Sequence, residues 1–163
     1  HSPRRGMVRG VDAAHLRAVP FLSSLTEDQL ASIARLGHEE HIATGTTIFQ
    51  EDTVGDAFYV VLSGRVRIVK HLAGGGQEAL TFIGPGGHFG EMALIDDFPR
   101  SASAVAQEDL VVSVISKDAL RQILAVDRDL AVTILWGFVQ TLSQRLRDTN
   151  DKLKAFFAFT GGF

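Results

Sequence analysis

The chain has 163 residues, which fits one domain with an appendage and is long enough to bury a real core. Its net charge of −3 gives no reason to expect a nucleic-acid-binding surface, and the lack of cysteine excludes disulfides, zinc–thiolate sites, iron–sulfur clusters and cysteine nucleophiles. No apolar run approaches the roughly 20 residues of a membrane span and no signal peptide is visible, so we expect a cytoplasmic protein without membrane contact.

The N-terminal part of the chain predicts two helices after an irregular start. Residues 1–11 are basic at their beginning and lack periodicity, so we expect them to be disordered or foreign to the natural protein. Residues 12–19 form a short helical pattern. A second helix is predicted by a capping box, in which Thr26 caps the first turn and Gln29 reaches back to it.

Between residues 38 and 116 the apolar pattern alternates, as it does in β-strands separated by glycine turns. Many short strands at close spacing predict a closed or two-sheet architecture, and a jelly roll is favoured. We therefore expect a mainly β fold with flanking helices, in which residues 12–126 form a β jelly-roll barrel domain. The expected strands are 41–43, 47–49, 58–62, 66–69, 79–83 and 110–115.

The C-terminal part returns to helical periodicity. Ser116 is expected to cap a short helix, and a long helix is expected over residues 127–158, followed by a tail at 159–163. A stripe that includes Ile134 and Phe138 is expected to face the β-domain. A second stripe has the a/d spacing of helices that pair, so it predicts a homodimer, the alternative being one amphipathic helix on its own barrel. This seam consists of Leu135, Val139, Leu142, Leu146, Thr149, Leu153 and Phe156.

Histidine and carboxylate spacing argues against a metalloenzyme. His38 and His41 are three residues apart on an expected strand, so they point to opposite faces. His71 and His88 are isolated in sequence, and no His-x-His pair exists. No Ser-His-Asp order or acid/base carboxylate pair can be assigned either. We expect no metal site, no catalytic residue and no enzymatic activity.

The most informative segment is residues 89–105, which read FGEMALIDDFPRSASAV. Gly90 begins a turn, and Arg100 follows a proline that fixes the local backbone. Such a turn can hold a small anion, because Arg100 supplies a positive fork and Ser101 a hydroxyl. Glu91 would repel a phosphate but can accept hydrogen bonds from a sugar hydroxyl. A phosphate beside a sugar hydroxyl describes a nucleotide.

Each of these residues also has a simpler interpretation. Arg100 fits an exposed loop, and Glu91 fits a favourable charge at a helix N-terminus. The glycines of residues 84–90 fit ordinary turns. The combination, rather than any single residue, favours a nucleotide site.

The same segment resembles the phosphate-binding cassette of cyclic-nucleotide-binding domains. Residues 45–52 and 55–64 are similar to the glycine-punctuated barrel strands of that family. The likeness extends over residues 15–157, and within the family it is greatest to the sensory domain of bacterial catabolite activator-type proteins.

The resemblance implies a role for each site residue in the cassette. Glu91 would bind the ribose 2′-hydroxyl, with backbone contacts from Gly90 and Met92. Arg100 would pair with the cyclic phosphate. The residues that would help Arg100, and those that would line the wall beside sugar and base, are Ser101, the Ala102 backbone N–H, Ile68, Leu80 and Thr81.

The resemblance also implies a lid from the long helix. Arg145 would approach Glu91, and Thr149 would meet the edge of the base. Asn150 stands where a residue of the partner subunit reaches across the dimer. Thr149 favours cyclic AMP, whereas Ser101 leaves cyclic GMP open.

These expectations describe a receptor that repositions its C-terminal helix to regulate a partner. In catabolite activator-type proteins a helix-turn-helix follows this helix, and residues 155–163 cannot hold one. Either the chain is truncated before a DNA-binding domain or it is a stand-alone receptor with a protein partner. A dimerisation module that has lost its ligand is a further alternative.

Overall fold

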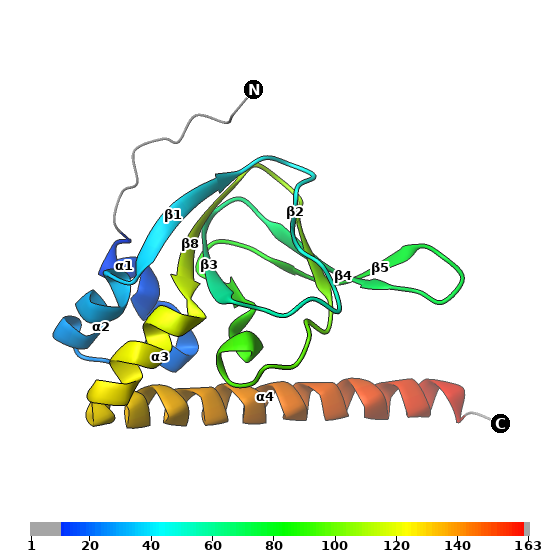
Figure 1. The fold of residues 1–163 in the computed structure, drawn as a ribbon. Helices are drawn as coiled ribbons and strands as arrows, with labels where there is room; N and C mark the ends of the chain where they lie inside the picture. The colour runs from blue at the N-terminus through cyan, green and yellow to red at the C-terminus, as the bar shows by residue number, and fades with distance from the viewer. Residues whose placement is uncertain (1–10, 162–163) are drawn as a thin grey trace.

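The computed structural model describes residues 11–161, so the expectations for residues 1–10 and 162–163 lie outside the described part. Two four-stranded antiparallel sheets face each other, with strand orders β1-β8-β3-β6 and β2-β7-β4-β5. Figure 1 shows the short helices gathered at one end of the sheets and a long helix, α4, along one side. The mainly β jelly-roll fold with flanking helices is therefore confirmed. The strands are β1 (Gly37–Ile42), β2 (Thr47–Phe49), β3 (Ala57–Ser63), β4 (Val66–His71), β5 (Gln77–Ile83), β6 (His88–Phe89), β7 (Ser103–Ala106) and β8 (Leu110–Ser116).

Both N-terminal helices begin after a capping residue, and the cap of the second helix was predicted. Asp12 caps α1 (Ala13–Arg17), and Thr26 caps α2 (Glu27–Ala34). In the predicted capping box the Thr26 hydroxyl accepts from the Gln29 N–H at 3.2 Å, and the Gln29 side chain accepts from the Thr26 N–H at 3.0 Å. Sequence patterns missed the 3-10 helix η1 (Pro20–Leu22) between them, in which Phe21 and Leu22 are buried.

Two strands lay outside the sequence-based expectation. β6 has only two residues between glycine turns, too few to show alternation. β7 is buried along its whole length, so it presents no polar face to mark it as a strand. The strand expected at 41–43 begins earlier, at Gly37, because residues 37–42 pair with β8 in continuous register.

The core consists of two apolar clusters. One lies inside the two-sheet sandwich and includes Val61, Phe89 and Val112. The other joins the helices to the end of the sheets, and at its centre the Phe21 ring stacks on the Phe138 ring with centroids 4.2 Å apart. This second cluster attaches α4 to the β-domain.

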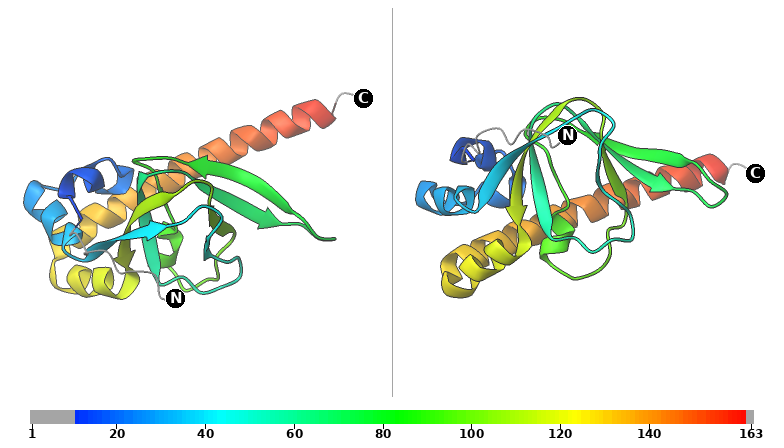
Figure 2. Two further views of the ribbon diagram at one scale, coloured as in Figure 1. Left: turned by 90° about the horizontal axis from the view of Figure 1, so that it is seen from above. Right: turned by 45° about the horizontal axis from the view of Figure 1, so that its top comes forward.

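Two helices follow the last strand. Ser116 caps α3 (Lys117–Val126), as predicted. Asp127 caps α4 (Arg128–Thr160), whose last two residues were expected in the tail; α4 continues because nothing before Gly161 interrupts the helical pattern. Figure 2 shows α4 projecting beyond the sheets in the same direction as the β4–β5 hairpin. Within residues 11–161 no helix is long and apolar enough to cross a membrane.

The two stripes of α4 differ in burial. Ile134 and Phe138 are 0% and 4% exposed, as expected for the stripe that faces the β-domain. Along the predicted seam five large side chains remain more than half exposed within the described chain, whereas Leu142 is only partly exposed. The five are Leu135, Val139, Leu146, Leu153 and Phe156.

Candidate ligand-binding site

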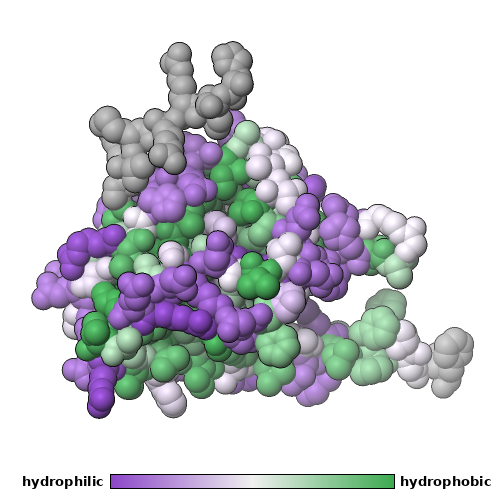
Figure 3. Space-filling view, viewed as in Figure 1, coloured by the Kyte–Doolittle hydropathy of each residue, from purple (hydrophilic) through white to green (hydrophobic). Residues whose placement is uncertain are grey.

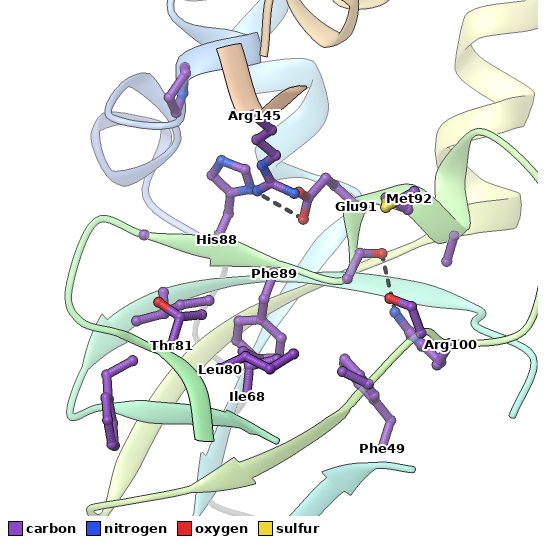
Figure 4. A pocket seen from close by; sticks show the side chains of 18 of the residues that line it. Phe49, Ile68, Leu80, Thr81, His88, Phe89, Glu91, Met92, Arg100 and Arg145 are labelled. Carbon is purple, nitrogen blue, oxygen red and sulfur yellow. Dashed lines mark hydrogen bonds and ion pairs between the residues drawn. The ribbon is translucent and has the colours of Figure 1, made fainter. Parts of the chain in front are cut away.

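A cleft of about 1230 Å³ lies between the sheets and α4. It brings together residues from β4, β5, the segment 84–102 and the middle of α4, as the close-up in Figure 4 shows for the labelled side chains. The cleft is lined by all the ligand-binding residues that were predicted in the cassette and in the wall beside it. Two of the three ligand-binding residues predicted on α4 also line it. Together these residues are Gly90, Glu91, Met92, Arg100, Ser101, Ala102, Ile68, Leu80, Thr81, Arg145 and Thr149.

Gly90 sets the position of the cassette carboxylate. Its φ of +79° lies in the left-handed region, and a Cβ there would come within 2.6 Å of Arg100 Nη1. Only glycine satisfies both conditions without strain. The turn at Gly90 starts the 3-10 helix η2 (Glu91–Leu94), whose first side chain, Glu91, is only 2% exposed.

Glu91 is contacted from two different elements. The imidazole Nδ1 of His88 lies 3.3 Å from Glu91 Oε2, and the guanidinium of Arg145 on α4 forms an ion pair with Oε1. Figure 4 shows both basic side chains converging on this carboxylate. Burial acts to raise the pKa of Glu91, but the contact with His88 and the charge of Arg145 hold that pKa below its ordinary value. The carboxylate is therefore charged at neutral pH.

Arg100 is 7% exposed and is held by the protein backbone. Its Nη2 donates to the Ala57 carbonyl at 2.9 Å and its Nη1 to the Gly90 carbonyl at 3.2 Å. The guanidinium carbon lies 3.8 Å from the centroid of the Phe49 ring, a cation–π distance. Burial lowers the pKa of Arg100, although an arginine stays protonated at any physiological pH. The result is a fixed positive charge on the cleft wall.

Both charged groups keep unused hydrogen-bonding capacity. Among residues 11–161, the buried Arg100 Nε has no hydrogen-bond partner, and the buried Glu91 Oε1 is ion-paired with Arg145 but makes no hydrogen bond of good geometry. A buried polar atom without a partner costs free energy, so a ligand that supplies an acceptor to Arg100 and a hydroxyl to Glu91 would stabilise the site. A phosphate next to a sugar hydroxyl meets both needs.

The remaining predicted residues occupy the rim. Leu80 on β5 is 55% exposed, and Thr81 beside it is also exposed. The Thr149 hydroxyl donates to the Arg145 carbonyl of its own helix at 2.8 Å. Asn150 is exposed on α4 and does not line the cleft; its predicted role across a dimer stays a prediction.

Sequence reasoning missed several lining residues. Phe49 was read only as a strand residue, and His88 only as an isolated histidine, yet both touch the charged groups of the cassette. Asp148 and Lys152 also line the cleft from α4. Helical spacing could have found these two, because they lie three and seven residues after Arg145 on the same face. Within the described chain, no group of three or more histidine, aspartate or glutamate side chains is placed to hold a metal ion.

Comparison with known proteins agrees with this geometry. The family model described as the cyclic nucleotide-binding domain matches residues 39–127, and the chain belongs to this family. The chain is 34% identical over 109 residues to a CRP-like cAMP-activated global transcriptional regulator of Mycobacterium tuberculosis. The matched residues make up 67% of this chain and 47% of that protein. The chain spans about half or less of the length of the curated relatives it matches.

Two solved structures show the same fold at 30% identity. The N-terminal domain of a transcriptional regulator from Streptomyces coelicolor A3(2) matches with a TM-score of 0.73, over 85% of this chain and 94% of that one. The catabolite activator protein of Thermus thermophilus matches with a TM-score of 0.74, over 84% of this chain and 62% of that one. The expected family, and its similarity to catabolite activator proteins, are thus confirmed.

Proposed function

We propose that this chain is a non-enzymatic receptor for a cyclic nucleotide, with cyclic AMP preferred over cyclic GMP. The observation that carries the proposal is the pair of buried, oppositely charged side chains in one cleft, Arg100 and Glu91. Within residues 11–161 Arg100 Nε has no hydrogen-bond partner, and Glu91 Oε1 makes an ion pair with Arg145 but no hydrogen bond of good geometry. Arg100 binds the cyclic phosphate with help from Ser101 and the Ala102 N–H. Glu91 accepts the ribose 2′-hydroxyl.

Ligand binding can regulate the position of α4 because the proposed ligand contacts come from two different parts of the fold. The phosphate and ribose contacts come from the segment 90–102, whereas Arg145 and Thr149 come from α4. Because Arg145 pairs with Glu91, a ligand that binds Glu91 acts on the position of α4. A ligand with different affinities for two positions of α4 shifts the population between them. The helix is therefore the output of the receptor, and a partner protein or an attached domain reads it.

The preference for cyclic AMP rests on Thr149, which lines the cleft on the α4 side where the base would lie. The Mycobacterium tuberculosis relative, by its name, is activated by cyclic AMP, which supports the same choice. Ser101 is exposed at the cleft rim and offers a hydroxyl to either nucleotide.

Calorimetric titration of the protein with cyclic AMP, cyclic GMP and linear 5′-AMP tests the proposal. We expect saturable binding of cyclic AMP below millimolar concentration, and weaker binding of the other two. Arg100→Lys keeps the charge but loses the two-pronged geometry, so it should weaken binding about 10- to 100-fold. Its melting temperature serves as the folding control, because the same change disturbs the bonds to Ala57 and Gly90. No saturable binding to the wild-type protein would overturn the proposal.

We further propose that two copies pair through α4. In Figure 3 apolar side chains gather along the lower edge of the molecule, over this helix. The exposed residues there repeat with the a/d spacing of a two-helix seam. Dimerisation would cover them and would also bring Asn150 of one copy towards the other. A sensory role within a longer transcription regulator agrees with the relatives that are named as transcriptional regulators. A cytoplasmic location stays part of the same proposal.

A further inference from the structure

His88 touches the ribose-binding carboxylate, and the proposed function gives it no role. We propose that His88 is the positioning residue of Glu91, which holds the carboxylate in the orientation that distinguishes a ribose from a deoxyribose cyclic nucleotide. This inference rests on the proposed function, since it concerns the same cleft. The inference adds His88 to the residues that determine which sugar the site accepts.

Strand β6 aims the histidine at Glu91. β6 pairs with β3 through Val60 opposite His88, so successive side chains on β6 point to opposite faces. Phe89 points into the sandwich and stacks on Tyr59, with ring centroids 4.9 Å apart. His88 points the other way, towards α4, as Figure 4 shows. Its Nδ1 then lies 3.3 Å from Glu91 Oε2.

The surroundings of His88 make Glu91 its natural partner. The side chain is 8% exposed, and its ring stands edge-on to Phe21 with centroids 5.3 Å apart. A polar nitrogen in such a place costs free energy unless it is paired. Within residues 11–161 Nδ1 has no hydrogen bond of good geometry, and the nearby acceptor is Glu91 Oε2. A small rotation of the carboxylate, as ligand binding would bring, completes that bond.

Arg145 cannot hold the orientation of the Glu91 carboxylate in the same way. It approaches the other oxygen of Glu91, and its side chain is 47% exposed on α4, the element that moves in the proposed mechanism. His88 belongs to the sheet and moves with the cassette. Glu91 therefore keeps its contact with His88 at Oε2 while the ribose hydroxyl of the ligand replaces Arg145 of α4 near Oε1. The histidine makes the orientation of Glu91 independent of the position of the helix.

A comparison of cyclic AMP with 2′-deoxy cyclic AMP tests this role, because the two ligands differ only in the hydroxyl that Glu91 binds. For the wild-type protein we expect cyclic AMP to bind about 10- to 100-fold more tightly than the deoxy analogue, the range for a hydrogen bond to a charged group. In His88→Phe, which keeps the aromatic edge against Phe21 and loses the nitrogen, this ratio should fall at least threefold. His88→Asn restores an N–H close to the position of Nδ1, so it should recover most of the ratio.

The ratio separates positioning from folding. If His88 only filled space, His88→Phe would weaken both ligands equally and leave the ratio at the wild-type value, and that result would overturn the inference. An Asn variant with a lower ratio than the Phe variant would overturn it as well. Melting temperatures of both variants show that the folded protein is being compared. Failure of the wild-type protein to bind any cyclic nucleotide is a separate outcome and refutes the proposed function itself.

Discussion

Gly137 offers a sharp test of how α4 is held against the β-domain. This residue lies where α4 crosses η1, and a Cβ at this position would lie 2.5 Å from the Phe21 carbonyl oxygen and 2.8 Å from the Phe21 Cα. Ordinary contacts between such atoms are about 3.5 Å, so Gly137→Ala must push the helix away by roughly 1 Å. The Phe21–Phe138 stack at 4.2 Å lies at the same contact and would be disturbed.

Opposing contributions determine whether Gly137→Ala raises or lowers the free energy of unfolding. Alanine gains about 1 kcal/mol over glycine inside a helix. Overpacking costs about 1–3 kcal/mol, and loss of an aromatic stack costs about 0.5–1.5 kcal/mol. We therefore expect the free energy of unfolding to fall by about 1–3 kcal/mol, which lowers Tm by about 2–4 °C for each kcal/mol.

Denaturant and thermal unfolding of Gly137→Ala measure this loss directly. Gly84→Ala is the matched control, because a Cβ at Gly84 meets no atom within 4 Å. Since Arg145 lies about two turns along the same helix, the displaced α4 should also weaken its ion pair with Glu91 and change the affinity for cyclic AMP. A Gly137→Ala protein as stable as the wild type would refute the close contact between α4 and η1.

Two further predictions concern acid stability and assembly. Glu51 accepts from Lys70 Nζ and from the backbone N–H of His71, and these contacts lower its pKa to about 2. Because the folded pKa is depressed, the stabilisation is present above the ordinary pKa and is lost as pH falls towards 2. The deficit of Glu51→Gln in free energy of unfolding should thus shrink from about pH 5 downwards; a deficit constant over this range would contradict the assignment. Separately, Leu146→Asp should give a monomer in sedimentation while Gln140→Asp, on another face of α4, stays dimeric; an unchanged mass for Leu146→Asp would exclude the seam.

Local signals account for what could be predicted. The cassette residues lie within 90–102, so the turn, the carboxylate and the arginine can be seen together in the sequence. The capping box at Thr26 is equally local, and it forms as expected. Helical spacing also separated the two stripes of α4, because a period of 3.6 residues places the neighbours Phe138 and Val139 about 100° apart around the helix. These features depend on neighbours in the chain.

Contacts between distant segments account for what could not be predicted. Phe49 lies under Arg100 only because β2 packs beside the cassette. His88 meets Glu91 because two-residue β6 joins the sheet in one register. β7 was missed because both of its faces are buried, so the alternation that identifies a half-exposed strand is absent. The contacts of each of these residues depend on segments that are distant in sequence, so they can be identified only from the tertiary structure.

A crystal structure of the protein with cyclic AMP is the sharpest test of the roles proposed for Arg100 and Glu91. We expect the cyclic phosphate within hydrogen-bonding distance of the Arg100 guanidinium, and the ribose 2′-hydroxyl within hydrogen-bonding distance of the Glu91 carboxylate. Cyclic AMP bound elsewhere, or bound in this cleft without contact to both side chains, would contradict these roles.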